Sequence, residues 1–282
     1  MQELVFFTGK GGTGKSTNAI IFALQEAKEK NIFLCSLDPA HNLKDILQIK
    51  SLEEINKTVS NLDIREPSIS EILKEYLEKM EDQLKSSHSY LSSFNLLDSL
   101  GLIKYSPGME EYAIFYEFQK LFTKNIDKKD VFIVDMPPTA LSIRFFSLAK
   151  LSVLWLDKLI DLRYRIINKK KIIDKVKKNI SSDDRVLSNL LEQKQNYQKT
   201  DKLLMESIIH VVLNPEPVSI NESRKLIKDL ENLGYKNIVI NVNKSNDEYN
   251  TEIEKLSSKY KTIQTPEFKK KPVGLNLLKK LV

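Results

Sequence analysis

Short apolar runs alternate along this chain with longer segments of helical composition. Several of the runs are continuously apolar rather than alternating, which is typical of parallel strands covered by helices on both faces. The pattern predicts an α/β fold built on a doubly wound, mostly parallel sheet. The expected strands are Leu4–Thr8, Ile32–Leu37, Leu62–Glu66, Val131–Asp135, Ile208–Leu213, Asn237–Val242 and Thr262–Thr265.

Two long segments interrupt this alternation. Residues 69 to about 119 and residues 141 to 205 are rich in Leu, Ile, Lys and Glu, and their apolar positions recur with helical spacing. No internal repeat, low-complexity tract or Pro/Gly linker separates them from the rest of the chain. We therefore predict a single domain over residues 1–282, in which the two insertions together form a helical subdomain.

Composition and hydropathy favour a soluble protein. Hydrophobic residues make up 41% of the chain and charged residues 29%. The densest apolar run, Leu151–Leu156, covers barely two helical turns, whereas a membrane-spanning helix needs about 20 apolar residues. No secretory signal precedes the first strand. A cytoplasmic location is therefore expected.

The net charge of +6 is concentrated in one segment. Residues 163 to 185 carry nine basic and three acidic side chains, an excess of six, so the remainder of the chain is neutral. A generally basic surface for nucleic acid is not expected, and we predict no specific nucleic-acid partner. The basic segment could contact acidic lipid, protein or nucleic acid, or it could be the solvated face of a helix.

Cysteine and histidine usage argues against zinc and redox chemistry. The single cysteine, Cys35, cannot form an internal disulfide or a Cys-x-x-Cys site, and its apolar neighbours predict a buried strand position. The three histidines are scattered and form no ligand pattern with carboxylates. We therefore predict no zinc site.

The first predicted strand runs directly into the sequence GKGGTGKST, residues 9–17. This stretch satisfies the phosphate-loop pattern G-x-x-x-x-G-K-[ST] at a strand-to-helix turn. In such a loop the backbone amides and the helix N-terminus surround phosphate, the lysine reaches the β- and γ-phosphates, and the serine hydroxyl ligates Mg²⁺. The motif predicts nucleotide binding by Gly9, Gly11, Gly12, Thr13, Gly14, Lys15, Ser16 and Thr17, with Ser16 also at the metal.

Two carboxylates follow other predicted strands. Asp135 ends an apolar run in the manner of a Walker B acid, which would hold Mg²⁺ through water. Asp38 also ends an apolar run, but from the residues alone it could equally cap the segment that follows Pro39. In open parallel sheets ligands bind at the carboxyl ends of the strands, where both acids and the phosphate loop fall.

Taken together, the motifs resemble those of the ArsA/guided-entry (tail-anchored protein targeting) ATPase family, within the SIMIBI class of P-loop NTPases with a deviant Walker A motif. GKGGTGKST, DPAHN (38–42), PGMEE (107–111), DMPPTALSIR (135–144) and NPEP (214–217) match in order and approximate spacing. The resemblance covers nearly all of the chain. It implies a homodimeric, Mg²⁺-dependent ATPase that couples ATP binding and hydrolysis to a membrane-protein client or to an anion- or arsenite-type pump.

The resemblance also implies catalytic roles. Lys10, one lysine more than the phosphate loop requires, resembles the family lysine that reaches the nucleotide of the partner subunit. Lys15 serves the phosphates of its own subunit. Asp38 resembles the acid that polarises the attacking water, and Asn42 belongs to the same switch. Asp135 resembles the metal-side acid of the second switch.

Three further residues resemble nucleotide contacts of the family. Glu216 of NPEP resembles a residue that approaches the partner's nucleotide, whereas Asn241 and the loop after Pro266 resemble adenine contacts. The chain also departs from the family. The switch glycine and histidine are missing between Pro138 and Arg144, and both the zinc-binding and the metalloid-binding cysteines are absent. The helical insertions are lysine-rich and poor in methionine, which suits a broad hydrophobic groove poorly.

A different class of function stays open. A MinD/ParA-like organiser would bind membrane or DNA according to its ATP state, and hydrolysis would only release it. The C-terminal segment Gly274–Val282 supports this alternative, because it could form a short amphipathic membrane anchor. The same segment could instead be a closing helix that packs on the core.

Overall fold

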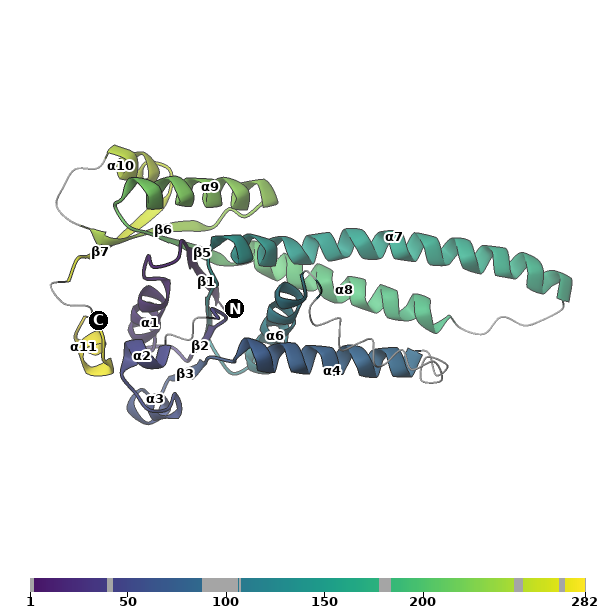
Figure 1. Cartoon of the computed structure of the whole chain (residues 1–282), viewed down its shortest axis with the longest axis horizontal. Coiled ribbons are helices and arrows are strands. Elements are labelled where there is room, and N and C mark those ends of the chain that lie inside the picture. Colours follow the sequence, from purple (N-terminus) through teal and green to yellow (C-terminus); the bar gives the residue numbers. More distant parts are fainter. Residues whose placement is uncertain are drawn as a thin grey trace.

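The computed structural model describes residues 3–39, 43–87, 106, 108–177, 184–245, 251–268 and 272–281. Its centre is a seven-stranded parallel sheet with the order β3-β2-β4-β1-β5-β6-β7 (Figure 1). This confirms the predicted doubly wound α/β fold. The strands are β1 (Glu3–Gly9), β2 (Ile32–Ser36), β3 (Leu62–Arg65), β4 (Val131–Asp135), β5 (Ile208–Leu213), β6 (Ile238–Ser245) and β7 (Lys261–Pro266).

Helices cover both faces of the sheet. One face packs against α1 (Lys15–Glu26), α2 (Leu43–Leu47), α3 (Glu53–Thr58) and α11 (Leu275–Lys280). The other packs against α6 (Met109–Asn125), α9 (Pro217–Leu233), α10 (Thr251–Ser257) and the first part of α7 (Thr139–Lys177). Successive residues of β1 alternate between the two cores: Leu4 and Phe6 join one, and Val5 and Phe7 join the other. Burial on both sides explains why the strands are continuously apolar in sequence.

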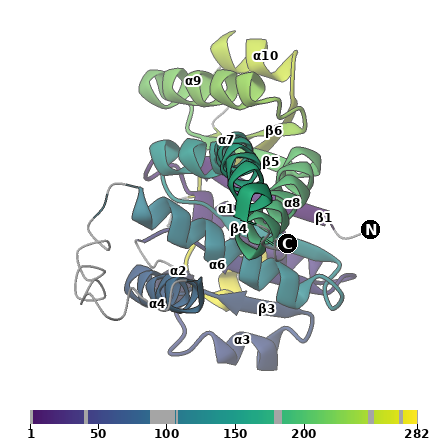
Figure 2. The ribbon, with the colours of Figure 1, turned by 90° about the vertical axis from the view of Figure 1, so that its right-hand side faces the viewer.

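The two predicted insertions form the helices that extend beyond the sheet. The first contains α4 (Ile69–Ser87) and α6, and the second contains α7 and α8 (Arg185–Glu206). Figure 2, which looks along the long axis of the molecule, shows α7 and α8 side by side, with α6 and α4 to one side of them. Much of the predicted basic segment, from residue 170 to residue 183, lies outside the described side chains.

Helix α7 departs from the expectation that no segment could cross a membrane. Among the described residues it is the one helix that is long and apolar enough to do so by length and composition, over Thr139–Lys169. Its first turns are a core helix, because Phe145 and Phe146 are each 1% exposed and pack against Phe6. The remainder of the helix leaves the core and extends along α8.

The C-terminal segment is a packed helix. Leu275 and Leu278 of α11 are buried in the core, and the helix contacts α1 and α2. Its apolar side is therefore already covered by the protein. The C-terminal segment therefore no longer supports the alternative of a membrane-anchored organiser.

His210 of β5 is a buried base beneath the sheet edge that carries the phosphate loop. Its ring stacks on Phe7 with centroids 4.6 Å apart, and its Nδ1 lies 3.1 Å from Oδ1 of Asn241. Burial lowers the pKa of His210 from 6.5 to about 4, although the bond to Asn241 acts in the opposite direction. The folded protein therefore keeps this imidazole neutral under conditions in which an unfolded chain would protonate it.

This difference predicts acid sensitivity. Between the folded and unfolded pKa values the unfolded chain binds more protons, so the contribution of His210 to the free energy of unfolding should fall by about 1.5 kcal/mol between pH 6.5 and pH 5. Buried Asp135, whose pKa is raised, acts in the opposite direction, so the difference between the unmodified protein and a His210 variant isolates this contribution. Urea unfolding at several pH values measures this slope. His210→Gln keeps a polar partner for Asn241 and should lose this part of the pH dependence. An unchanged slope in the variant would contradict the assignment.

Candidate nucleotide site

The loop between β1 and α1 has the backbone that a phosphate loop requires. Gly12 and Gly14 have φ angles of 80° and 89°, a left-handed conformation that favours glycine. A Cβ at Gly14 would also lie 2.5 Å from Nδ2 of Asn243. A Cβ at Gly11 or Gly12, by contrast, would meet nothing within 4 Å. Gly14 is therefore packed closely against Asn243, whereas Gly11 and Gly12 border open space.

Side chains of the loop itself, of α1 and of the distant strand β6 hold this loop in place. The Thr13 hydroxyl donates to the carbonyl of Lys10 at 2.9 Å, and Nδ2 of Asn243 donates to the carbonyl of Thr13 at 2.8 Å. Nδ2 of Asn18 donates to the carbonyl of Gly14 at 2.9 Å. These bonds hold the carbonyls of Lys10, Thr13 and Gly14, which fixes the backbone of the loop in the shape that an anion-binding loop needs.

A cavity of about 770 Å³ opens against the loop at the carboxyl end of the sheet. Its volume lies in the range of pockets that hold a nucleotide-sized ligand. It brings together the phosphate loop, the end of β2 and the end of β7, which are distant in sequence. Predicted site residues that line it are Gly11, Gly12, Gly14, Lys15, Ser16, Thr17, Asp38 and Pro266.

Lys15 and Asp38 form a buried pair on the wall of this cavity. Nζ of Lys15 lies 3.7 Å from Oδ2 of Asp38, and the two side chains are only 5% and 10% exposed. The residues alone left Asp38 between a capping and a functional role, and the structure places its carboxylate beside the phosphate-loop lysine. A cation and a carboxylate thus share one wall of the cavity.

Asp135, at the end of β4, is fully buried next to this pair. Burial raises the pKa of its carboxyl to about 7, although the hydroxyls of Ser16 and Ser36 and the Lys15 cation act in the opposite direction. Ser36 donates to Oδ2 at 2.9 Å, whereas Oδ1 is a buried oxygen without a hydrogen-bond partner among the described residues. Such an oxygen fits a cation, because a divalent ion would offset the cost of burying the charge.

Mg²⁺ is the ion that this donor set suits. It is usually held by one or two protein oxygens together with waters and substrate phosphates rather than by a complete protein cage. Asp135 and the Ser16 hydroxyl provide such oxygens. Within the described part of the chain no group of three or more His, Cys, Asp or Glu side chains could hold a metal.

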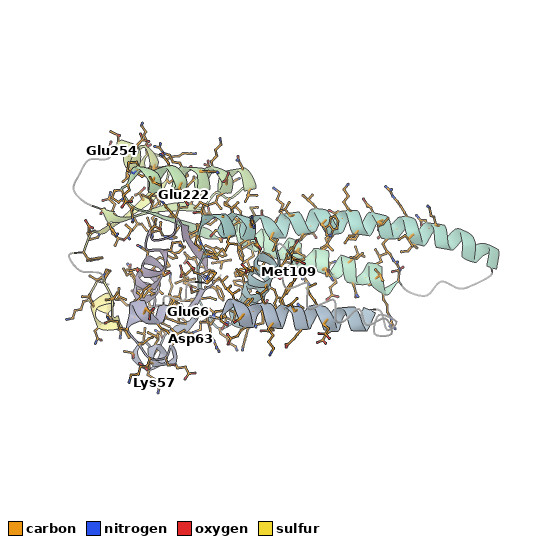
Figure 3. All side chains as sticks on the ribbon, in the orientation of Figure 1. Lys57, Asp63, Glu66, Met109, Glu222 and Glu254 are labelled. Carbon is orange, nitrogen blue, oxygen red and sulfur yellow. The ribbon has the colours of Figure 1, made fainter. Side chains whose placement is uncertain are left out.

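Lys10 lies apart from this wall and does not line the cavity. Its Nζ is 3.8 Å from Oε2 of Glu222 on α9, and both side chains are more than one third exposed. Oε1 of Glu222 accepts a hydrogen bond of 3.0 Å from the Thr139 hydroxyl, at the start of α7. Figure 3 labels Glu222 on α9 near this point. The two lysines of GKGGTGKST therefore face different surroundings.

The structure separates the remaining predicted residues. Asn241 does not line the cavity, because its side chain is buried against His210, and Asn243 lines it instead. Glu216 is exposed at the start of α9 and is not in the cavity wall. Asn42 lies outside the described residues.

Sequence reasoning missed Asn243 and Glu222. Asn241 and Asn243 project from the same face of β6, since side chains alternate along a strand. Asn243 lies two residues closer to the carboxyl end, where ligands of parallel sheets bind, and that rule could have favoured it. No local signal marks Glu222, because its partners Lys10 and Thr139 meet it only through the fold.

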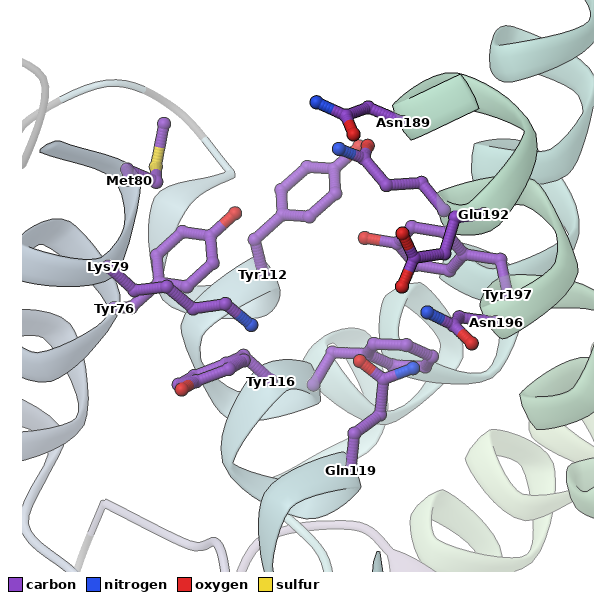
Figure 4. A pocket seen from close by; sticks show the side chains of 12 residues that line it. Tyr76, Lys79, Met80, Tyr112, Tyr116, Gln119, Asn189, Glu192, Asn196 and Tyr197 are labelled. Carbon is purple, nitrogen blue, oxygen red and sulfur yellow. The ribbon is translucent and has the colours of Figure 1, made fainter. Parts of the chain in front are cut away.

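A second cavity, of about 460 Å³, lies among the insertion helices (Figure 4). Its walls come from α4, α6 and α8, and Figure 4 shows the Lys79 ammonium and the Glu192 carboxylate turned toward it from opposite walls. Nζ of Lys79 lies over the Tyr116 ring, 4.1 Å from its centroid. Because tyrosines, amides and charges line this cleft, it does not provide a broad apolar groove.

A parallel sheet whose first strand ends in a phosphate loop, beside a buried acid at the end of the neighbouring β4, defines a P-loop NTPase. The family described as "Anion-transporting ATPase" matches residues 2–280. The chain therefore belongs to this family of ATPases, and the predicted resemblance is confirmed.

Curated relatives agree with this membership. A protein of Aquifex aeolicus named "Putative arsenical pump-driving ATPase 2" is 28% identical over 248 residues, which cover 86% of this chain and 80% of that protein. An "ATPase ASNA1 homolog" of Dictyostelium discoideum is 28% identical over 84% of this chain and 71% of its own length. The homolog of Cryptosporidium parvum is 27% identical over 84% of this chain, which spans 64% of that relative.

The two asparagines of β6 offer a matched test of the cavity wall. Asn243→Ala removes the bond that holds the Thr13 carbonyl, so we expect about tenfold weaker nucleotide binding with a modest loss of stability. Asn241→Ala should leave nucleotide affinity within about twofold and instead lower the unfolding free energy, because buried His210 loses its partner. Titration with a fluorescent ATP analogue and urea unfolding measure both. The reverse pattern would restore Asn241 as the nucleotide contact.

Proposed function

We propose that the protein is a Mg²⁺-dependent ATPase that hydrolyses ATP as a homodimer. The observation that carries this proposal is the separation of the two phosphate-loop lysines. Lys15 is buried on the cavity wall beside Asp38, whereas Lys10 does not line the cavity and its side chain is 36% exposed. A second copy that faces the loop would bring its own Lys10 to the nucleotide of the first.

Within one subunit, the side chains divide the chemistry of phosphoryl transfer. Lys15 neutralises charge on the phosphates, and the loop amides hold them. Asp38, held at the wall by Lys15, orients a water molecule for attack on the γ-phosphate. Bound Mg²⁺, held by Ser16 and Asp135, would neutralise further charge as it develops.

Lys10 can leave its position in the monomer at little cost. An ion pair whose side chains are more than one third exposed, such as that with Glu222, contributes at most about 1 kcal/mol. Contact with the phosphates of a partner's nucleotide, away from water, would stabilise the transition state by considerably more. Assembly of the dimer and completion of the catalytic site would then be the same event.

The start of α7 supports coupling of this site to the insertion helices. Only Met136, Pro137 and Pro138 separate Asp135 from α7, and the Ser142 hydroxyl donates to the Pro137 carbonyl at 2.7 Å. A shift at Asp135 would therefore move the base of a 39-residue helix. We propose that the ATP state moves α7 and α8 relative to α4 across the second cavity, much as a hinge does.

The proposed output of this motion is the handling of a membrane-protein client or the drive of a membrane pump. The name of the pump-driving relative supports the pump, and the resemblance of the motifs to the tail-anchored protein targeting ATPases supports the client. A cytoplasmic location stays a prediction. The MinD/ParA-like alternative has lost its supporting observation, because α11 is packed on the core.

The trans role of Lys10 has a direct test. Lys10→Ala and Asp38→Asn should each lower the turnover number at least about 100-fold, because each removes a group that acts on the transition state. Nucleotide affinity of the monomer should change by less than about threefold, since neither residue holds the ground-state nucleotide alone. The measurements are steady-state phosphate release and fluorescent-nucleotide titration, with the exposed Lys225→Ala on α9 as control.

Mixing the two inactive variants sharpens this test. In a mixed dimer, the subunit with intact Asp38 would receive an intact Lys10 from its partner, so one competent site would return. Random pairing of equal amounts should recover about one quarter of wild-type activity. No recovery on mixing, or near-normal hydrolysis by Lys10→Ala alone, would refute the trans lysine.

Glu222 should restrain Lys10 in the monomer. Glu222→Gln removes the charge that attracts Lys10 but keeps an oxygen for Thr139. The protein concentration for half-maximal hydrolysis should therefore fall about two- to fivefold, the scale of a weak surface ion pair. Asp229→Asn on the same helix is the control. A concentration dependence that rises in Glu222→Gln would show that this pair assists assembly instead.

A further inference from the structure

The part of α7 that leaves the core carries a row of exposed apolar side chains. Leu151, Leu154, Trp155, Leu162 and Ile166 are 56%, 57%, 65%, 54% and 46% exposed. They are spaced by three, four and seven residues, so they fall on one side of the helix, which we call the outer face of α7. Soluble proteins expose single apolar residues commonly, but contiguous ones mark an interaction surface.

The opposite side of the same helix is satisfied by the protein itself. Ser152, Leu156 and Ile160 are buried, and α7 packs along α8. In Figure 1, α7 forms the upper edge of the extended part with α8 beneath it, and Figure 3 shows side chains projecting from α7 on the side away from α8. None of the apolar residues of the outer face lines the 460 Å³ cleft.

Cations are interleaved with the apolar residues of the outer face. Lys158, Arg165 and Lys169 are exposed and lie seven, fourteen and eighteen residues after Leu151, so they share its side of the helix. None of the three forms an ion pair with a carboxylate of the described residues. Among the described side chains of this part of α7, Asp161 is the one exposed acid that flanks them. The surface is therefore apolar and positively charged.

The charges that face α8 are arranged differently. Arg163 pairs with Asp184 at 3.0 Å, and Asp157 pairs with Lys194 at 2.5 Å, in both cases across the two helices. Among the described residues, the charges of α7 that face α8 have ion-pair partners, whereas the cations of the outer face have none. This contrast indicates that the partner of the outer face supplies the negative charge.

We propose that the outer face of α7 docks on an anionic lipid surface. Leucine and tryptophan side chains would enter the boundary of head groups and acyl chains, while lysine and arginine would bind lipid phosphates and carboxylates. An apolar protein segment would cover the leucines but leave the cations without partners. The inference goes beyond ATP hydrolysis and does not depend on it.

The helix would lie on the membrane rather than cross it. Phe145 and Phe146, at the base of α7, are packed in the core of the sheet domain and cannot enter a bilayer without unfolding it. From Leu151 to Lys169 the outer face is about 27 Å long, enough for several lipid head groups. Such contact would place the ATPase beside membrane proteins without an inserted anchor.

Trp155 makes the proposal directly measurable, because it is the only tryptophan of the chain. The full-length protein is mixed with vesicles of phosphatidylglycerol and phosphatidylcholine, or of phosphatidylcholine alone, and tryptophan emission and flotation are recorded. Emission should shift to shorter wavelength with the anionic vesicles only. Added salt should weaken this binding, because cations and lipid head groups meet at an exposed surface.

Surface variants separate the apolar and charged contributions. Leu154→Ser with Leu162→Ser, and Lys158→Glu with Arg165→Glu, should each weaken vesicle binding at least about tenfold while keeping Trp155 as reporter. The matched controls on α9 are Val218→Ser, at a side chain that is 63% exposed, and Lys225→Glu with Lys228→Glu. Controls should bind vesicles as the unmodified protein does, and all variants should retain ATP hydrolysis in solution.

Several results would overturn the proposal. One is a Trp155 emission that does not shift with anionic vesicles. Another is equally strong binding to neutral vesicles. A third is a loss of vesicle binding in the α9 control variants as large as that in the α7 variants. A blue shift that needs only ATP and higher protein concentration would assign the face to a second copy. The same shift with a neutral apolar helical peptide, but not with vesicles, would assign it to a client segment. Lys10→Ala should still bind vesicles. Vesicle binding can therefore be judged even if the proposed ATPase mechanism fails.

Discussion

The burial of the Asp135 carboxylate is the constraint on which the rest of the site depends. The end of β4 is completely enclosed, and burial holds the pKa of this acid near 7 while one of its oxygens lacks a partner among the described residues. The ionised form of this buried carboxylate is stabilised by a nearby cation. Lys15 and the proposed metal ion would therefore both lie beside Asp135. Asp135 stands four positions before α7, so this buried carboxylate lies at the base of the longest described helix.

Glu222 joins elements that the chain itself keeps far apart. Through one carboxylate it contacts Lys10 of the phosphate loop and Thr139 at the start of α7. Neither contact is strong, and weak, exposed interactions are what a switching element needs, because a strong one would hold a single state. In the proposed dimer, departure of Lys10 toward the partner's nucleotide would thus change the charge at the base of α7.

Helix α7 combines two physical environments in one continuous element. Its base is fixed by aromatic packing in the core, whereas its extension exposes leucines, a tryptophan and unpaired cations. In the proposed mechanism, a rigid helix of this kind would carry movement at the sheet to a surface far from the nucleotide site. The site and the outer face of α7 would then be parts of one lever, although they have different chemistry.

The sequence by itself determined the parallel sheet, the phosphate loop and the position of the two insertions. Buried strands, glycine conformation and helical periodicity are local properties of the sequence. Gly14 could be recognised from the loop residues beside it, and Asp135 from the apolar run that it ends. Only the tertiary structure decided that Asn243 rather than Asn241 lines the cavity, that α11 is packed, and that Glu222 meets Lys10. These outcomes depend on which distant surfaces cover a side chain, and no local pattern records that covering.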